Sequence, residues 1–267
     1  IQFIRELVKN YLVLAHREEN LPDIALTEEN QTRQDFESDG FAKYYSKKSK
    51  GRKEKSRRTY QLNGAKAGYG NLQVMEATLS TSELLSKSRE YGVSMTVLLT
   101  AVFLCAIEKE MTERQKSNPV ALMVPVNLRR FFPSASMLNF FGWIEPFYQF
   151  GADPAVLEDV IASVSRYFNE ELTKERLGTR MGNLVRLEYN PFLRVTPLEL
   201  KNLGMMLGAK MAKKNVTAIF SNMGSISMPC EYVPYIRRFG VFISTPKIEL
   251  CMCSFEDTVT LSFTSAY

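Results

Sequence analysis

Two short segments of the chain carry residue types that could serve chemistry, and the first follows an apolar run. It reads Val124-Pro125-Val126-Asn127-Leu128-Arg129 and continues through Arg130 to Asn139-Phe140-Phe141-Gly142-Trp143. A strand that ends near Val126 would deliver Arg129 and Arg130 to a loop at the edge of a sheet. A guanidinium there can hold a carboxylate through two hydrogen bonds. On spacing alone, both arginines are more often solvated loop charges.

The second segment is Ser221-Asn222-Met223-Gly224-Ser225, directly after the apolar run 216–220. The simpler interpretation is a turn that ends a strand, since Ser, Asn and Gly are common turn residues. The alternative is that Ser221 and Asn222 offer hydrogen bonds to a substrate or to a developing oxyanion. Composition does not decide between these two interpretations.

Taken together, the two segments resemble motifs of the chloramphenicol-acetyltransferase-like superfamily. Wax ester synthases, alcohol acetyltransferases, plant acyltransferases of the BAHD group and condensation domains of nonribosomal peptide synthetases have similar runs. In that superfamily the Arg of the first motif pairs with the Asp of a His-His-x-x-x-Asp-Gly motif in the other lobe. The resemblance implies that Arg129 supports the active site structurally, and that Asn139, Ser221 and Asn222 line a substrate tunnel.

The same resemblance implies a fold and a reaction. Each lobe of such a protein is a two-layer α/β unit, and this chain would be the carboxy-terminal lobe. Residues 1–15 would form the helix after the active-site motif, 16–71 a crossover or linker, and 72–267 the lobe itself. The reaction would move an acyl group from a coenzyme A or carrier-protein thioester to an alcohol or amine, with no permanently bound cofactor. Its partners would be the amino-terminal lobe and the small-molecule donor and acceptor.

The catalytic histidine of that scheme is expected upstream of the chain, and no catalytic residue is expected within it. His16 is the only histidine, and the run His16-Arg17-Glu18-Glu19-Asn20-Leu21 has Asn and Leu where the motif needs Asp and Gly. We therefore expect a surface residue there. No cysteine has a nearby histidine, and there is no Gly-rich phosphate loop or metal-ligand cluster.

Apolar periodicity predicts an α/β domain with a mixed sheet. Helical spacing covers 1–14, 82–91, 94–112, 153–174, 180–189 and 198–212, and strand-like runs cover 72–79, 120–126, 140–150, 215–221, 239–244, 248–255 and 259–264. Ser80 with Glu83 forms a capping box, and Ser94 can cap the next helix. Helices interspersed with strands favour two layers with both strand orientations.

The net charge of +5 is concentrated in one run between Phe41 and Tyr60, which holds nine basic residues and one acidic residue. The rest of the chain is mildly acidic. A solvated linker is the expected interpretation of such a run, so no nucleic-acid partner is expected. Attraction of nucleic acid, an anionic membrane or the phosphates of coenzyme A is the alternative.

Other global features fit one part of a longer cytoplasmic protein. Four cysteines at unremarkable spacings are expected to be reduced. The longest apolar run, 95–107, is shorter than the roughly 20 residues that span a bilayer, so no transmembrane segment is expected. The sequence begins without an initiator methionine or a signal peptide pattern. Both ends are therefore expected to be internal to a longer protein. A noncatalytic binding module that keeps this fold is the alternative to an enzyme, and the sequence upstream of Ile1 would separate the two.

Overall fold

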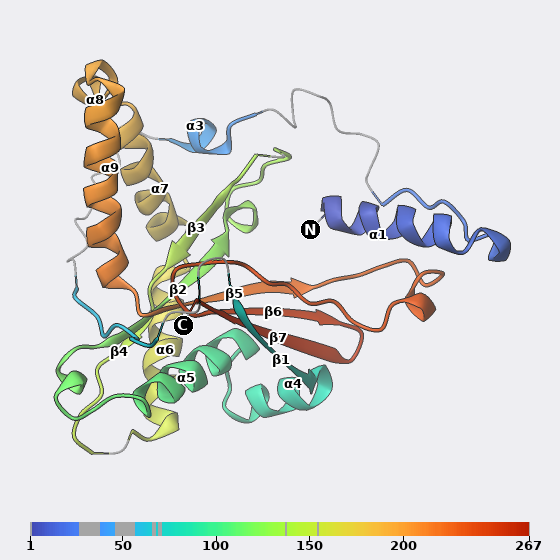
Figure 1. The fold of residues 1–267 in the computed structure, drawn as a ribbon, viewed down its shortest axis with the longest axis horizontal. Helices are drawn as coiled ribbons and strands as arrows, with labels where there is room; N and C mark the ends of the chain where they lie inside the picture. Colours follow the sequence, from blue (N-terminus) through green and yellow to red (C-terminus); the bar gives the residue numbers. More distant parts are fainter. Residues whose placement is uncertain are drawn as a thin grey trace.

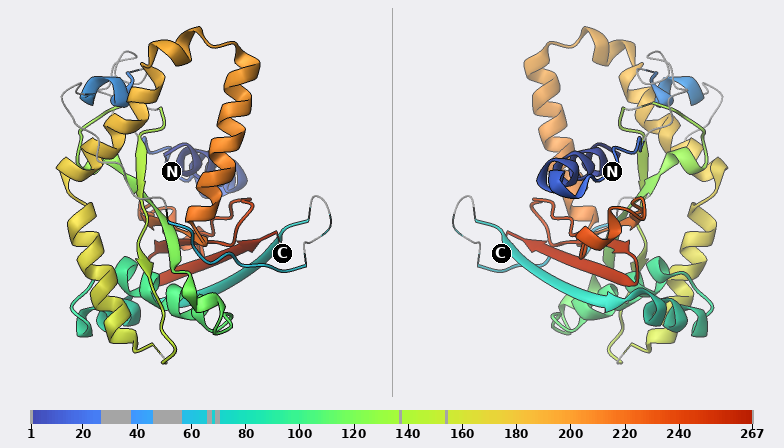
Figure 2. Two further views of the ribbon diagram at one scale, coloured as in Figure 1. Left: turned by 90° about the vertical axis from the view of Figure 1, so that its left-hand side faces the viewer. Right: turned by 90° about the vertical axis from the view of Figure 1, so that its right-hand side faces the viewer.

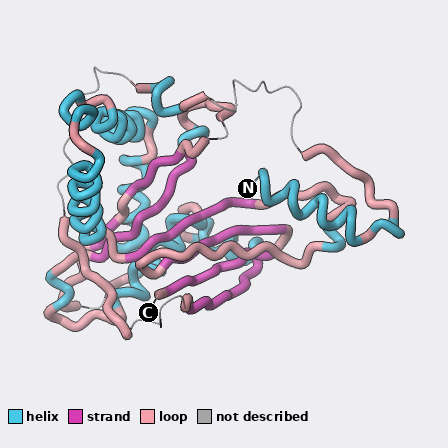
Figure 3. The backbone as a smooth tube through the Cα atoms, turned by 45° about the horizontal axis from the view of Figure 1, so that its top comes forward, coloured by secondary structure: helices cyan, strands magenta, loops and turns pink. Residues whose placement is uncertain are grey.

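The computed structural model describes residues 2–26, 38–45, 57–65, 68, 71–136, 138–153 and 155–266. Its centre is one twisted mixed sheet (Figures 1 and 3). The strand order is β1-β7-β6-β5-β2-β3, and β4 also pairs with β2. The strands are β1 Gln73–Ser80, β2 Val120–Asn127, β3 Phe141–Ile144, β4 Phe147–Tyr148, β5 Ala218–Ser225, β6 Glu249–Phe255 and β7 Thr258–Ser265. Strands β2, β5 and β6 run parallel and the other pairings are antiparallel, which confirms the predicted mixed sheet.

Helices account for about half of the remaining described residues. The α-helices are α1 Gln2–Ala15, α3 Gly40–Tyr44, α4 Thr81–Glu90, α5 Met95–Glu108, α6 Leu157–Glu171, α7 Lys174–Glu188, α8 Pro191–Val195 and α9 Leu198–Ala212. Short 3-10 turns are η1 Arg17–Glu19, η2 Gln115–Ser117, η3 Leu128–Arg130, η4 Lys213–Asn215 and η5 Val233–Tyr235. Helix α3 is an element that the sequence analysis did not predict.

One face of the sheet carries the main hydrophobic core. Leu250 and Met252 of β6 and Leu261 of β7 are buried in the same cluster as the apolar residues of α5 and α6. Helix α5 is apolar on nearly every side, with Ala101 and Leu104 fully buried. A helix that is apolar on nearly every side needs cover on more than one side, and α5 contacts both the sheet and α6.

The opposite face of the sheet is polar yet buried. Cys251, Cys253 and Ser262 alternate with the core residues along β6 and β7, and each is at most 1% exposed. The segment from 226 to 247 covers them. Cys253 Sγ donates to the carbonyl of Phe239 at 3.3 Å, and Thr264 Oγ1 donates to the carbonyl of Ile243 at 2.7 Å.

That covering segment corrects one prediction, because residues 239–244 do not form a strand. The backbone carbonyls there accept hydrogen bonds from side chains of the sheet face, not from the backbone of an edge strand. The predicted strand over 140–150 is also divided, into β3 and β4. Both pieces keep one antiparallel register against β2, and Pro146 lies between them without a backbone N–H for the ladder.

The two predicted helix caps, at Ser80 and Ser94, are confirmed. Ser80 accepts a hydrogen bond from the Glu83 amide at 3.2 Å and caps α4, and Ser94 accepts from the Val97 amide at 3.3 Å and caps α5. The β6–β7 turn reinforces the first cap. Asp257 Oδ1 accepts from the Ser82 amide at 2.8 Å, so a turn of the sheet holds the end of a helix in place.

Two helical regions keep large apolar side chains in solvent. Figure 2 shows α7, α8 and α9 as an arch above the sheet, and Figure 1 shows α1 on the opposite side of the molecule from α9. In α9 Leu198 is 66% exposed and Met205 is 72% exposed, and in α1 Phe3 is 75% exposed. Within the described residues, no single helix is long and apolar enough to cross a membrane; only α4 and α5 taken together as a bent pair reach that length and composition.

The contact between Asp257 and α4 predicts a pH-dependent stability. Its hydrogen bonds, above all the one from the Ser82 amide, hold the pKa of Asp257 below its ordinary value near 3.8. A lowered folded-state pKa stabilises the fold above the unfolded pKa, and this contribution is lost as the pH falls through the folded value. We expect Asp257→Asn to lower the thermal midpoint at neutral pH, with the difference from wild type narrowing below about pH 4. A difference that stays constant during acid titration would contradict this assignment.

Candidate functional site

The candidate site lies at the carboxyl edge of the parallel strands. Strands β2 and β5 run parallel with Met123 opposite Ile219, and β5 and β6 run parallel with Ser221 opposite Cys251. The ends of β2 and β5 therefore face the same way, and η3 with Arg129 follows the end of β2. In open α/β sheets, ligands bind in the crevice outside the carboxyl ends of strands. Both sequence segments singled out for chemistry thus belong to that edge.

Arg129 braces the loop that joins β2 to β3. Its Nη2 atom donates to the backbone carbonyls of Ser136 and Leu138, each at 2.7 Å. The Asn127 side chain accepts from the Arg129 amide at 3.1 Å and starts η3. Two charge-assisted bonds from one nitrogen fix this loop against the end of β2. The pairing of Arg129 with an Asp of another lobe stays a prediction.

The other predicted site residues divide between two faces of the sheet. Asn222 Nδ2 donates to Thr96 Oγ1 of α5 at 2.7 Å, and its Oδ1 accepts from the Gly224 amide at 2.8 Å. Asn222 therefore lies on the helical face, whereas Ser221 shares the polar face with Cys251. Ser221 is 7% exposed, while Asn139 is exposed in the loop before β3. Their assignment to a substrate tunnel stays a prediction.

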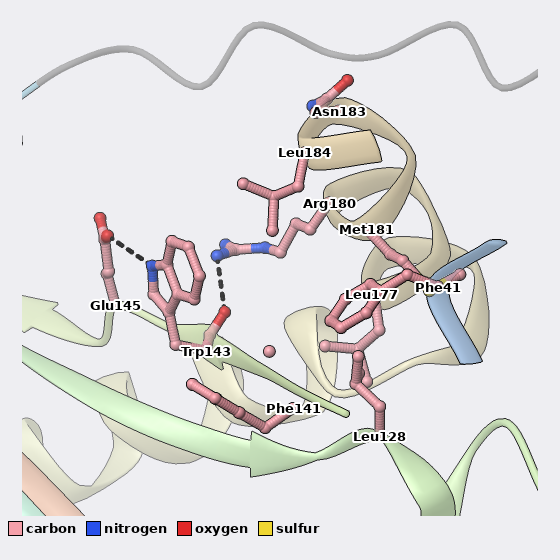
Figure 4. A pocket seen from close by; sticks show the side chains of 11 residues that line it. Phe41, Leu128, Phe141, Trp143, Glu145, Leu177, Arg180, Met181, Asn183 and Leu184 are labelled. Atoms are coloured by element: carbon pink, nitrogen blue, oxygen red, sulfur yellow. Dashed lines mark hydrogen bonds between the residues drawn. The ribbon is translucent and has the colours of Figure 1, made fainter. Parts of the chain in front are cut away.

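A cavity of about 310 Å³ lies between β3 and α7, beside the first segment (Figure 4). Both halves of that segment line it, Leu128 from η3 and Gly142 and Trp143 from β3. Most lining side chains are apolar: Phe41, Leu128, Phe141, Leu177, Met181 and Leu184. Three lining side chains are polar, namely Glu145, Arg180 and Asn183.

The arginine of this cavity belongs to an internal charge network. Arg180 Nη2 lies 3.0 Å from Oε2 of Glu171, which is 8% exposed, and Nη1 donates to the Trp143 carbonyl at 3.0 Å. Arg176 binds the second oxygen of Glu171 at 2.8 Å. Trp143 Nε1 donates to Glu145 at 3.0 Å. A paired and hydrogen-bonded charge can remain buried, so this network ties α6, α7 and β3 together.

Sequence reasoning missed Arg180, although a signal was present. The predicted helix began at residue 180, whereas α7 begins at Lys174. The longer helix places Arg180 within an apolar stripe formed by Leu177, Met181 and Leu184, at spacings of three and four residues. An arginine inside such a stripe must find a buried partner, and Glu171 on the preceding helix provides it.

Helix α3 covers the segment from the other side. Its Asp39 cap accepts from the Phe41 amide at 2.8 Å. The Phe41 ring meets Phe140 edge-on, with centroids 5.1 Å apart, and the Tyr44 hydroxyl donates to the Pro133 carbonyl at 2.5 Å. Part of the predicted linker therefore packs on the loop that Arg129 braces.

Other candidate residues of the sequence analysis lie away from this edge. His16 follows α1, where its Nδ1 lies 3.1 Å from Glu19 and its ring lies 4.4 Å from that of Tyr235. All four cysteines are free. Burial, with the Glu249 carboxyl as a further cause, raises the pKa of Cys251 to about 12. A thiol of that pKa is not a nucleophile near neutral pH.

Metal ligands and the basic run add little to the site. The described part of the chain contains no group of three or more His, Cys, Asp or Glu side chains that could hold a metal ion. Most of the basic run, residues 46–56, lies outside the described residues. At its end the Arg57 guanidinium lies 3.4 Å from the centroid of the Phe147 ring, so this arginine contacts strand β4.

The loop brace predicts a loss of stability in one arginine variant. Arg129→Ala removes two hydrogen bonds from a charged donor, and we expect a loss of roughly 2 kcal/mol in the free energy of unfolding. Arg130→Ala, at the adjacent exposed position, should stay within about 0.5 kcal/mol of wild type. Urea denaturation measures both. Equal effects of the two variants would refute the brace.

The close packing of α3 predicts a second effect. A Cβ atom added at Gly40 would lie 2.9 Å from two ring atoms of Phe140, which is 1% exposed. Gly40→Ala should therefore destabilise the chain by about 1–3 kcal/mol through overpacking. Gly151→Ala, where a Cβ meets no atom within 4 Å, is the matched control. An unchanged free energy of unfolding in Gly40→Ala would show that α3 can shift away from Phe140 without loss of stability, and would contradict this prediction.

Solved structures resemble the fold at low sequence identity. The trichothecene 15-O-acetyltransferase of Fusarium sporotrichioides matches with a TM-score of 0.50 and 13% identity, over 77% of this chain and 45% of that chain. Polyketide synthase associated protein 5 of Mycobacterium tuberculosis gives 0.45 and 15%, over 73% and 47%. The epimerization domain of the third module of tyrocidine synthetase B gives 0.49 and 12%, over 98% and 59%. The chain spans about half the length of these proteins.

Sequence comparison gives the family directly. No curated protein matches this sequence. Residues 67–229, more than half of the chain, match the carboxy-terminal domain of phthiocerol/phthiodiolone dimycocerosyl transferases. The matched range contains β1 to β5 and the whole of the segment braced by Arg129. The resemblance to chloramphenicol-acetyltransferase-like acyltransferases is confirmed, and the chain belongs to the family of phthiocerol/phthiodiolone dimycocerosyl transferase carboxy-terminal domains.

Proposed function

We propose that the chain is the carboxy-terminal half of an acyltransferase that moves an acyl group from a thioester to an alcohol or amine. The observation that carries the proposal is the placement of Arg129. In a chain of this acyltransferase family, it fixes the loop at the carboxyl edge of β2 through the Ser136 and Leu138 carbonyls. The same edge borders the apolar cavity between β3 and α7.

The exposed apolar helices support a partner of the size of a lobe. Helix α1 presents Phe3 and Leu7, and α9 presents Leu198 and Met205, all more than half exposed. Large apolar side chains exposed on one helix in this way mark an interaction site. An amino-terminal lobe that supplies the catalytic histidine would cover these helices and complete a tunnel along the carboxyl edge.

The proposed reaction divides the work between the two halves. The histidine of the other half would take the proton of the acceptor hydroxyl or amine as its oxygen or nitrogen attacks the thioester carbonyl. The carbon–sulfur bond then breaks, and the departing thiolate receives that proton. This half contributes a fixed loop and an apolar wall, which position the reactants without a covalent acyl-enzyme. Arg129 is a positioning residue in this scheme.

The test uses the full-length protein with its upstream sequence. We expect His-His-x-x-x-Asp-Gly within about ten residues before Ile1, and thiol release from an acyl-coenzyme A that depends on an alcohol or amine acceptor. Arg129→Ala should lower kcat by at least about tenfold, since misplaced reactants lose the benefit of orientation. Arg129→Lys should recover little because the lysine side chain is one bond shorter, so its Nζ atom does not reach the place where Nη2 serves both carbonyls.

Arg130→Ala is the control and should keep wild-type kcat. An intact motif with wild-type turnover in Arg129→Ala would overturn the positioning role. Absence of both the motif and acceptor-dependent thiol release would instead favour a noncatalytic module with this fold.

A further inference from the structure

We propose that the cavity between β3 and α7 binds the end of an uncharged aliphatic chain, and that Gly142 sets its depth. The source of such a chain, an acyl donor or a fatty alcohol acceptor, rests on the proposed function. Binding itself is measured without turnover, so the two proposals can fail separately.

The size and lining of the cavity point to an apolar ligand. Its volume of about 310 Å³ is at the lower end of the range for pockets that hold small molecules, roughly 300–1,000 Å³. Figure 4 shows Phe41, Leu128 and Leu177 gathered on one side, Glu145 on the opposite side and Asn183 at the top, next to Leu184. Apolar cavities stay dry and accept apolar guests. The end of a chain therefore fits the side away from the polar groups.

Two of the three polar side chains that line the cavity, Arg180 and Glu145, are bound to other groups of the protein. Arg180 donates to the Trp143 carbonyl and pairs with Glu171, and Glu145 accepts from the Trp143 indole. A ligand carboxylate or phosphate would have to displace these bonds and leave the Glu171 carboxyl with only one of its two arginine partners, Arg176. An uncharged chain disturbs none of them. The chemistry of the lining thus favours a hydrocarbon over a charged head group.

Gly142 leaves room at the floor of the cavity. A Cβ added there would contact the Leu128 side chain at 3.4 Å, an ordinary van der Waals distance. One methyl group therefore fits, whereas a leucine would extend into the space next to Leu128. The residue type at position 142 accordingly controls how far a chain can enter.

The chain contains its own reporter for this test. Trp143 is the single tryptophan of the sequence and lines the cavity. Decanol carrying a bromine at its far end should quench Trp143 fluorescence saturably, because bromine quenches by contact. Among unbranched alcohols from hexanol upward, competition should strengthen by roughly fourfold for each added methylene, equivalent to about 0.8 kcal/mol per buried methylene. The gain in affinity per methylene should vanish once the chain is long enough to fill the cavity.

Matched variants test the location. Gly142→Leu should weaken quenching and affinity at least tenfold, whereas Gly151→Leu, in a loop position with open space, should behave as wild type. Leu184→Phe narrows the same cavity from a 41% exposed position on α7, so it should weaken binding even if Gly142→Leu folds poorly. Thermal unfolding verifies that each variant is folded.

A second quenching experiment, with a brominated acyl thioester, distinguishes the acyl donor from the alcohol acceptor as the source of the chain. Quenching by coenzyme A esterified with decanoic acid brominated at its far end, lost in Gly142→Leu, identifies the acyl donor as the source; quenching by the alcohol alone identifies the acceptor. Equal quenching of wild type, Gly142→Leu and Leu184→Phe, or an affinity independent of chain length, would overturn the proposal.

Discussion

The rest of the structure depends on strand β2, because this strand pairs on both sides. One pairing is parallel and the other is antiparallel. Its parallel pairing with β5 aligns the carboxyl ends of the central strands, and its antiparallel pairing with β3 folds the chain back over them. Leu122 of β2 is fully buried, which fixes the register, since a slip of one residue would turn it to the wrong face. The loop of Arg129 and the cavity floor at Leu128 both begin where this strand ends.

Much of the fold could be predicted because its signals are local. The capping box at Ser80 and Glu83, the cap at Ser94 and the apolar spacing of α1 and α9 each involve residues a few positions apart. The error at residues 239–244 has the opposite cause. Phe239 and Ile243 have strand-like composition, but their carbonyls accept from Cys253 and Thr264 across the sheet face, and no local pattern encodes such a partner.

The sequence analysis named a residue of the site, Arg129, but it did not predict which groups this residue contacts. The first segment led to Arg129, yet the two carbonyls that Arg129 holds become visible only when the loop closes on itself. The cavity needed three separate parts of the chain: Phe41, the β3 residues around Gly142, and α7. Contacts of this long range are set by tertiary packing, which overrides the weak local propensities of a five-residue helix such as α3.

Two features depart from the ordinary pattern of burial: a buried pair of charged side chains and a helix with exposed apolar side chains. Glu171 and Arg180 are charges kept inside, which is tolerable because each satisfies the other and because Arg176 adds a second bond to the carboxylate. The apolar residues of α9, such as Leu198 and Met205, are the reverse case, because their side chains are exposed to solvent. Within the described residues no packing partner buries these two side chains. Departures from local rules concentrate where a protein has a function. The internal pair secures the wall of the cavity, and the exposed helix keeps an apolar surface that the proposed amino-terminal lobe would cover.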